Sequence, residues 1–214
     1  MVFAIDASGS VKEEGYKQIK EFTKGIIDNF DIGVSKTHVG VVTFSEYAEL
    51  QIKLTDTFDK NDLYKRIDGL KYAGYRTALD DALRVVNKEM FANLDGGARQ
   101  NVPQILIFLT DGKCTVCTED LQTVVSPLKD SGVTIYTIGV TENINRTELE
   151  IISSEPSRNY TFEVDTFKDL KDITENLRHK FCFGNEEILI NLYHLSFLYI
   201  MFWLFMSCFL VNCY

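Results

Sequence analysis

The sequence predicts an α/β fold with a doubly wound, mostly parallel six-stranded sheet, one antiparallel edge strand and helices on both faces. Short apolar runs alternate along the chain with segments of helical spacing, which is typical of a parallel sheet covered by helices. Two of the runs, residues 2–5 and 105–109, are apolar throughout, as expected for strands buried on both faces. Residues 48–54 instead alternate apolar and polar side chains, which indicates an edge strand. The 214 residues are enough to bury such a sheet.

The first half of the chain supplies three strands and two helices. The strand at 2–5 leads into a helix at 11–30, where apolar side chains recur every three or four residues. The apolar run 38–44 predicts the second strand, and the edge strand at 48–54 is hairpinned to it. Residues 59–70 predict a short helix behind an acidic start.

The second half of the chain supplies the remaining helices and strands. Apolar residues along one side of residues 77–90 predict an amphipathic helix. The strand at 105–109 is the most apolar one and is therefore expected at the centre of the sheet. The elements expected after it are a helix from residue 121 that ends near Ser131 and Gly132, a strand at 133–140, a short helix at 146–153, a strand at 160–164 and a closing helix at 167–181.

Oxygen-bearing side chains gather where the first strand ends. Asp6, Ser8 and Ser10 lie between the strand's carboxyl end and the amino end of the next helix, which is where open α/β sheets bind ligands. One carboxylate and two hydroxyls suit a hard divalent cation. Taken alone, these residues are better explained as turn formers and helix caps.

Two further stretches favour a cation site. The central strand ends in Thr110-Asp111-Gly112, and Thr77 opens the amphipathic helix at 77–90. With Asp6, Ser8 and Ser10, these motifs resemble the von Willebrand factor type A (I-domain) family, in the subset found in matrilins, collagen VI and related adhesion proteins. The resemblance covers residues 2–183. In that family the three motifs form a metal-ion-dependent adhesion site (MIDAS).

The resemblance implies a role for each residue of the site. Ser8 and Ser10 would coordinate Mg²⁺ directly, Asp6 and Asp111 would act largely through water, and Thr77 would join directly in the ligand-competent state. Mn²⁺ or Ca²⁺ could take the same place. A cation held mostly by neutral hydroxyls keeps its charge and can accept a carboxylate from a partner protein. The implied function is therefore an extracellular adhesion module that binds collagen or another matrix protein, without enzymatic activity.

Two positions depart from the family pattern, which usually has glycine at both. Tyr75 should stiffen a loop that normally shifts when ligand binds. Asp80 lies one helical turn after Thr77 and could add negative charge near the cation. We expect it instead to be a solvated carboxylate favoured by the helix amino end.

Cys114 and Cys117 follow the central strand and precede a helix, so three interpretations compete. Thiolates at that position would suit a thiol–disulfide oxidoreductase. A local disulfide on a surface loop is the interpretation we favour, and zinc would need two more ligands that the sequence does not indicate.

A structural A domain with a vestigial metal site is a further alternative for the function of the whole domain. Relatives of the matrilin type pair a cysteine like Cys182 with one upstream of the first strand, and that residue is absent here.

Composition narrows the classes of partner and compartment. The net charge of −9 at pH 7 argues against nucleic acid as a partner, because phosphate binding needs a basic surface. Asn145-Arg146-Thr147 and Asn159-Tyr160-Thr161 are glycosylation sequons, which favour a secreted or cell-surface protein. No signal peptide precedes the first strand, so we expect the sequence to be a fragment or an incomplete gene model.

The C-terminal tail differs from the rest of the chain. We expect the type A domain to cover residues 1–183, a short linker 184–187, and an apolar tail 188–214 that holds no Asp, Glu, Lys or Arg. The tail is long enough to span a bilayer core of ~30 Å. A membrane anchor and translated non-coding sequence explain it equally well, whereas a lipid-attachment signal fits less well because almost no polar spacer precedes it.

Overall fold

The computed structural model describes residues 1–92, 96–174 and 177, and residues Met1–Thr174 form one compact unit. Six strands make a single sheet in the order β3-β2-β1-β4-β5-β6, in which only the β2–β3 pair is antiparallel. The predicted fold class is therefore confirmed, with the antiparallel strand at the edge. The strands are β1 (Val2–Asp6), β2 (Gly40–Phe44), β3 (Ala48–Ile52), β4 (Ile105–Thr110), β5 (Thr134–Val140) and β6 (Thr161–Val164).

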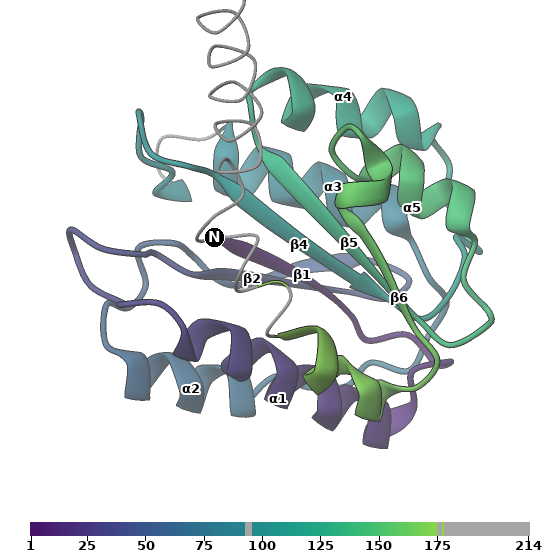
Figure 1. The fold of residues 1–214 in the computed structure, drawn as a ribbon, viewed down its shortest axis with the longest axis horizontal. Helices are drawn as coiled ribbons and strands as arrows, with labels where there is room; N and C mark the ends of the chain where they lie inside the picture. The colour runs from purple at the N-terminus through teal and green to yellow at the C-terminus, as the bar shows by residue number, and fades with distance from the viewer. Residues whose placement is uncertain (93–95, 175–176, 178–214) are drawn as a thin grey trace, which may run out of the picture. The chain divides into compact units, whose positions relative to one another are not determined.

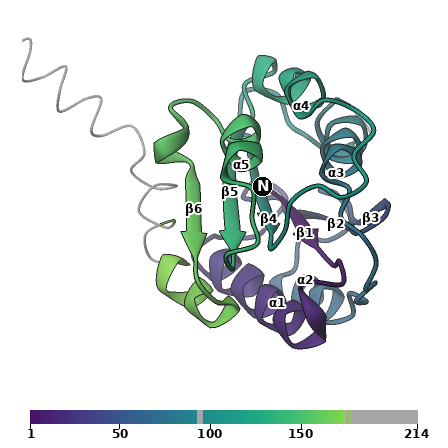
Figure 2. The same cartoon turned by 90° about the vertical axis from the view of Figure 1, so that its right-hand side faces the viewer.

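Helices cover both faces of the sheet, as Figure 1 shows. On one face lie α1 (Lys12–Asp28) and α2 (Lys60–Asp68). On the other lie α3 (Leu79–Val86), α4 (Leu121–Asp130) and α5 (Arg146–Ile152). A second view, turned by a quarter, separates the same two layers (Figure 2).

The boundaries differ from the prediction mainly at the two ends of α3. The helix begins at Leu79, two residues after Thr77, and continues after Val86 as the π-helical turn Asn87–Phe91. The closing helix predicted at 167–181 starts with the 3₁₀ turn Phe167–Asp169 and is helical up to Thr174. Nearly all of its remainder lies outside the described residues.

Strands β1 and β4 form the centre of the sheet and are buried along almost their whole length. Val2 and Ala4 belong to the apolar cluster built with α3 and α4. Because side chains alternate along a strand, Phe3 and Ile5 face the layer of α1 and α2. Edge strand β3 alternates in burial, as its sequence pattern predicted.

The pairing of β1 with β4 positions the candidate site. The two strands are parallel, with Ile5 opposite Leu109, so both end at the same edge of the sheet. The last residues of the two strands, Asp6 and Thr110, and the loops that follow them are therefore neighbours in space. Figure 1 shows the arrowheads of the parallel strands at this common edge.

No helix among the described residues is long and apolar enough to cross a membrane. The apolar tail 188–214, for which a membrane anchor was one interpretation, lies outside those residues, as do the linker 184–187 and Cys182.

Candidate metal centre

The structure brings all five predicted site residues together at the carboxyl edge of the sheet. Ser8 Oγ lies 3.2 Å from Ser10 Oγ, and Ser10 Oγ donates a 2.6 Å hydrogen bond to Asp111 Oδ1. The backbone N–H of Ser8 donates to Asp6 Oδ1 at 2.8 Å. Thr77 reaches the same place from the loop before α3.

Gly112 shows how closely these groups converge. A Cβ atom placed on this glycine would lie 3.7 Å from Ser10 Oγ and 3.9 Å from Thr77 Oγ1. The hydroxyls of Ser10 and Thr77 therefore flank one glycine, which itself follows Asp111. The three motifs predicted from separate parts of the chain form a single cluster of oxygen atoms.

The two carboxyl groups of the cluster are buried, and the negative charge of one disfavours ionisation of the other. Asp6 and Asp111 are both almost fully buried, and among the described residues neither forms an ion pair with a cationic side chain. Burial raises the pKa of Asp6. Burial, together with the negative charge of Asp6, raises the pKa of Asp111 to about 6. A cation at this position would offset both effects, because it favours the ionised carboxylates.

Thr110 supports the candidate site, a role that the sequence analysis did not identify. Its hydroxyl donates a 2.6 Å hydrogen bond to Asp6 Oδ2, and both side chains are buried. Thr141 contributes similarly, since its hydroxyl donates to the Asp111 carbonyl at 3.3 Å. No local sequence pattern could have revealed this contact of Thr110, because it depends on the strand register that places Leu109 beside Ile5.

The loop that carries Thr77 is joined to the first metal loop by backbone hydrogen bonds. Gly9 N–H donates to the Tyr75 carbonyl at 2.7 Å, and Gly74 N–H donates to the Ala7 carbonyl at 2.8 Å. Gly74 has a φ of +81°, which glycine adopts without steric cost. The Tyr75 side chain is 65% exposed, so this segment is held by its backbone rather than by its tyrosine ring.

Asp80 does not lie where the sequence predicted. The residue is only 2% exposed, so the prediction of a solvated carboxylate is wrong. Asp80 Oδ2 accepts hydrogen bonds from Thr118 N at 2.8 Å, Thr118 Oγ1 at 3.2 Å and Glu119 N at 3.1 Å. The physical reason is the loop between β4 and α4, which covers the start of α3 and excludes water from this carboxylate.

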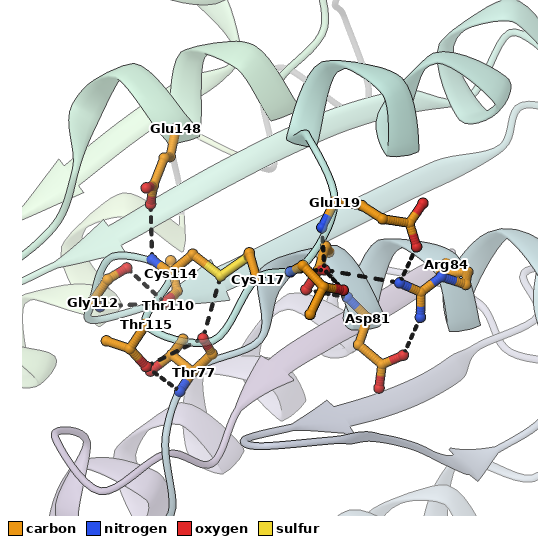
Figure 3. The surroundings of a disulfide bond; sticks show 12 residues. Thr77, Asp81, Arg84, Thr110, Gly112, Cys114, Thr115, Cys117, Glu119 and Glu148 are labelled. Atoms are coloured by element: carbon orange, nitrogen blue, oxygen red, sulfur yellow. Dashed lines mark hydrogen bonds and ion pairs between the residues drawn. A yellow bond between two sulfur atoms is a disulfide. The ribbon is translucent and has the colours of Figure 1, made fainter.

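A disulfide joins Cys114 and Cys117 within that loop, in agreement with the favoured interpretation (Figure 3). The Asp80 carboxylate lies within 4.8 Å of both sulfur atoms, and it is the one additional acidic, histidine or cysteine ligand found beside them among the described residues. The pair therefore has at most one of the two extra ligands that a zinc site would require.

A polar pocket of about 470 Å³ adjoins the metal edge. Its lining includes Ala7 of the first metal loop, Ser45 at the end of β2, and the tyrosines Tyr47 and Tyr72. Tyr47 is among the most exposed large side chains of the protein. The cluster of oxygen atoms thus lies beside a polar recess in the surface.

Comparison with known protein families gives one match over most of the chain. The family model described as von Willebrand factor type A domain matches residues 1–176. All five site residues fall inside the matched segment.

Curated relatives with similar sequences are matrix proteins. The collagen alpha-1(XXI) chain of Xenopus laevis is 31% identical over 182 residues, covering 85% of this chain and 18% of the relative. The collagen alpha-6(VI) chain of Mus musculus is 32% identical, covering 87% and 8%. Matrilin-3 of Gallus gallus is 28% identical, covering 86% and 40%. The chain therefore spans less than half the length of each of these relatives.

Solved structures with the same fold include one that contains a metal. Proximal thread matrix protein 1 from the mussel byssus, in a structure with a zinc-occupied MIDAS motif, aligns with a TM-score of 0.77 at 32% identity. The alignment covers 85% of this chain and 45% of the mussel protein. A von Willebrand factor type A protein from Catenulispora acidiphila aligns with a TM-score of 0.64 at 21% identity, covering 84% of this chain and 41% of that protein.

Proposed function

The chain belongs to the von Willebrand factor type A domain family, and from this membership we propose that it is a divalent-cation-dependent adhesion module of the extracellular matrix, without enzymatic activity. The observation that carries the proposal is the convergence of Asp6, Ser8, Ser10, Thr77 and Asp111 at one edge of the sheet. The named relatives, collagens and matrilins, support the matrix setting.

The donor set fits a hard divalent cation. Three hydroxyl groups and two carboxylates offer only oxygen, which is the ligand type that Mg²⁺ and Mn²⁺ prefer. The two buried carboxylates lack a cationic partner among the described residues, and a bound cation would supply the missing positive charge. Ser8 and Ser10 would hold Mg²⁺ directly, Thr77 would join them when ligand is bound, and Asp6 and Asp111 would hold it largely through water.

The chemistry that the cation would supply is attraction for an acidic side chain of the partner. Ser10 is the exposed member of the cluster, so the partner would approach from its side. The polar recess beside Ala7 and Ser45 would accept neighbouring residues of the partner. Collagen or another extracellular matrix protein with an exposed Asp or Glu is the partner class we propose.

Two other functions considered from the sequence receive less support. A thiol–disulfide oxidoreductase is not what the matrix relatives indicate, and the Cys114–Cys117 disulfide lies in a loop anchored to its surroundings by hydrogen bonds. A structural domain with a vestigial site would keep the fold but bind no cation. The experiment below separates that second alternative from the proposed function.

Titration of Mg²⁺ into the wild-type protein and into Asp111→Ala, followed by calorimetry, tests the proposal. The substitution removes a buried carboxylate that accepts from Ser10, and we expect Mg²⁺ affinity to fall by about 100-fold or more. Ser8→Ala and Ser10→Ala should each lose one direct ligand and bind more weakly than wild type.

Asp130→Ala is the matched control. It removes the same charge from the exposed last residue of α4, at the opposite edge of the sheet, and should leave Mg²⁺ affinity nearly unchanged. Equal heats from wild type and Asp111→Ala, or no heat from either, would contradict the metal site and favour the vestigial alternative. Repeating the titration with Mn²⁺ and Zn²⁺ would establish which cation the site prefers.

A further inference from the structure

Three features that the metal site does not itself use lie on, or are hydrogen-bonded to, the loop segment that contacts Thr77. They are the disulfide between Cys114 and Cys117, the buried carboxylate of Asp80, and the hydroxyl of Thr115. Figure 3 shows the disulfide segment next to Thr77, with dashed hydrogen bonds joining the two. We call residues 114–119 the brace.

The brace holds both backbone polar groups of Thr77. Thr115 N–H and Val116 N–H both donate to the Thr77 carbonyl, at 2.9 Å and 3.3 Å. The Thr77 N–H in turn donates to Thr115 Oγ1 at 2.9 Å. Helix α3 has no side-chain cap at its start, so these contacts fix the backbone from which the Thr77 hydroxyl projects.

Each end of the brace is anchored to a different helix. At one end, Cys114 N–H donates to Glu148 Oε2 of α5 at 2.9 Å. At the other, Thr118 and Glu119 donate three hydrogen bonds to Asp80 of α3. The Cys114–Cys117 disulfide closes the turn between these two anchors. Within that turn, the N–H groups of Thr115 and Val116 both point at the Thr77 carbonyl oxygen.

We infer that the brace positions Thr77 in the metal site, and that Asp80 helps to position Thr77 by anchoring the brace. Opening the Cys114–Cys117 disulfide therefore lowers the affinity of the site for divalent cations. The inference rests on the proposed function, because it concerns the same cation. Its physical basis is that an opened turn gains conformational freedom, which must be lost again whenever Thr77 returns to its ligating position.

An external dithiol is the reductant that the inference requires. Its thiolate attacks one sulfur of the disulfide, the Cys114–Cys117 bond breaks, and a mixed disulfide forms. The second thiol of the reductant then displaces the remaining protein sulfur. Cys114 and Cys117 each end with a proton, and the reductant leaves as a disulfide. Both cysteines are only partly buried, so a small dithiol can reach them.

The test measures Mg²⁺ affinity of the full chain in its two redox states. Wild-type protein is titrated before and after reduction with dithiothreitol, the reductant being removed without air. We expect about tenfold weaker binding after reduction, as is typical when a group that orients a metal ligand is lost. The variant Cys114→Ser/Cys117→Ser should bind as weakly as the reduced wild type. Mg²⁺ is preferred to zinc because a hard cation does not bind the freed thiols next to Asp80.

The double variant also controls for the other cysteines of the chain. Cys182, Cys208 and Cys213 remain in it, so reduction of this variant should leave its Mg²⁺ affinity unchanged. A reduction-dependent change in the double variant equal to that of the wild type would overturn the inference. It would assign the effect to those three residues.

Asp80 is tested by comparing Asp80→Asn with Asp80→Ala. Asparagine keeps an oxygen that can accept from Thr118 and Glu119, whereas alanine removes the anchor entirely. We expect Asp80→Ala to lower Mg²⁺ affinity about tenfold, and Asp80→Asn to retain most of the wild-type affinity. If Asp80 serves stability alone, both variants would change the melting temperature of the cation-free protein while the Mg²⁺ affinity stays at the wild-type value.

The redox comparison needs no folded Asp80 variant and distinguishes this inference from the proposed function. If oxidised wild type binds Mg²⁺ and reduction weakens the binding, both are supported. If oxidised and reduced wild type bind equally, the brace inference is overturned and the metal site stands. If oxidised wild type binds no cation, both are overturned.

Discussion

Asp111, like Asp6, is a buried carboxyl group whose raised pKa makes its proton compete with the cation. Burial and the charge of Asp6 raise its pKa to about 6. Below that pH the carboxyl group is protonated, and Mg²⁺ must displace the proton in order to bind. We therefore predict that Mg²⁺ affinity falls as the pH is lowered from about 7.5 to about 5, by up to about tenfold per pH unit below the pKa. Calorimetric titration at several pH values measures this, and a pH-independent affinity would contradict it.

The same pKa shift fixes the sign of the pH effect on the cation-free protein. A carboxyl group whose pKa is higher in the folded than in the unfolded state binds its proton more tightly when folded. The contribution of Asp111 to stability is thus lost as the pH rises from about 4 to about 6. Asp111→Asn carries no charge and should lose less stability over this pH range than wild type, with the remaining loss coming from Asp6, whose pKa is also raised by burial. Thermal unfolding of both proteins in the absence of cation checks the sign.

The sequence was sufficient to predict that the five site residues lie together, but not which groups support them. Asp6 ends a buried strand, Ser8 and Asp111 follow buried strands, and the strand order brings their loops to one edge. The role of Thr110 depends on the register of β1 against β4, which no local pattern contains. Asp80 was misjudged for a similar reason, since its burial comes from a loop that lies about forty positions later in the chain.

At the scale of single elements, the helices differ in how their amino ends are held. Helix α2 begins with Asp59, whose carboxylate accepts the Asp62 N–H at 2.7 Å. Helix α4 begins with Asp120, which accepts from Thr123 in the same way. Helix α3 has no such cap, and its start is held by the brace. The start of α3, two residues after Thr77, therefore depends on a long-range contact rather than on a local side-chain cap.

This difference leads to a prediction for Asp59→Ala. The substitution removes a side-chain cap on α2, which should lower the free energy of unfolding by ~1 kcal/mol. Mg²⁺ affinity should not change, because among the described residues α2 makes no hydrogen bond to the five site residues. Chemical denaturation and a Mg²⁺ titration of the same variant measure both quantities. A loss of affinity with Asp59→Ala would show that cap and site are coupled.

The types of the elements were predictable, whereas some of their ends were not. Apolar spacing over 77–90 gave the helix, yet the regular α-helix covers Leu79–Val86 and a π-helical turn follows. Thr77 lies outside the helix because its N–H and carbonyl bond to the brace instead of to a helical turn. Periodicity cannot report such competition, since it records which residues face the core and not which backbone groups are already bonded.

At the scale of the whole molecule, the topology follows from the alternation of strands and helices. A parallel strand pair needs a crossover, and the helices in the sequence supply one between each pair of parallel neighbours. The most apolar strand, β4, lies at the centre next to β1, as its composition predicted. The alternating strand β3 lies at the edge, where one of its faces meets solvent. The pattern of apolar residues thus predicted the positions of β4 and β3 in the sheet correctly.

The compactness of Met1–Thr174 leads to a last prediction, for the chain truncated after residue 187. The sheet, both helical layers and all five residues of the candidate site lie within this compact unit. The segment 188–214, which the truncation removes, is uncharged and apolar. We predict that residues 1–187 give a soluble, cooperatively folding protein with the Mg²⁺ affinity of the full chain. Removing an apolar segment that the core does not require should also reduce aggregation.

Circular dichroism, thermal unfolding and a Mg²⁺ titration of the truncated chain, each beside the full chain, decide the matter. A cooperative transition with unchanged affinity would show that the adhesion module is complete without the tail. An unfolded product, or one that folds but no longer binds Mg²⁺, would show that residues after 187 complete the core or the site. The two failures are distinguishable, because loss of folding removes the unfolding transition, whereas loss of the site alone leaves it in place.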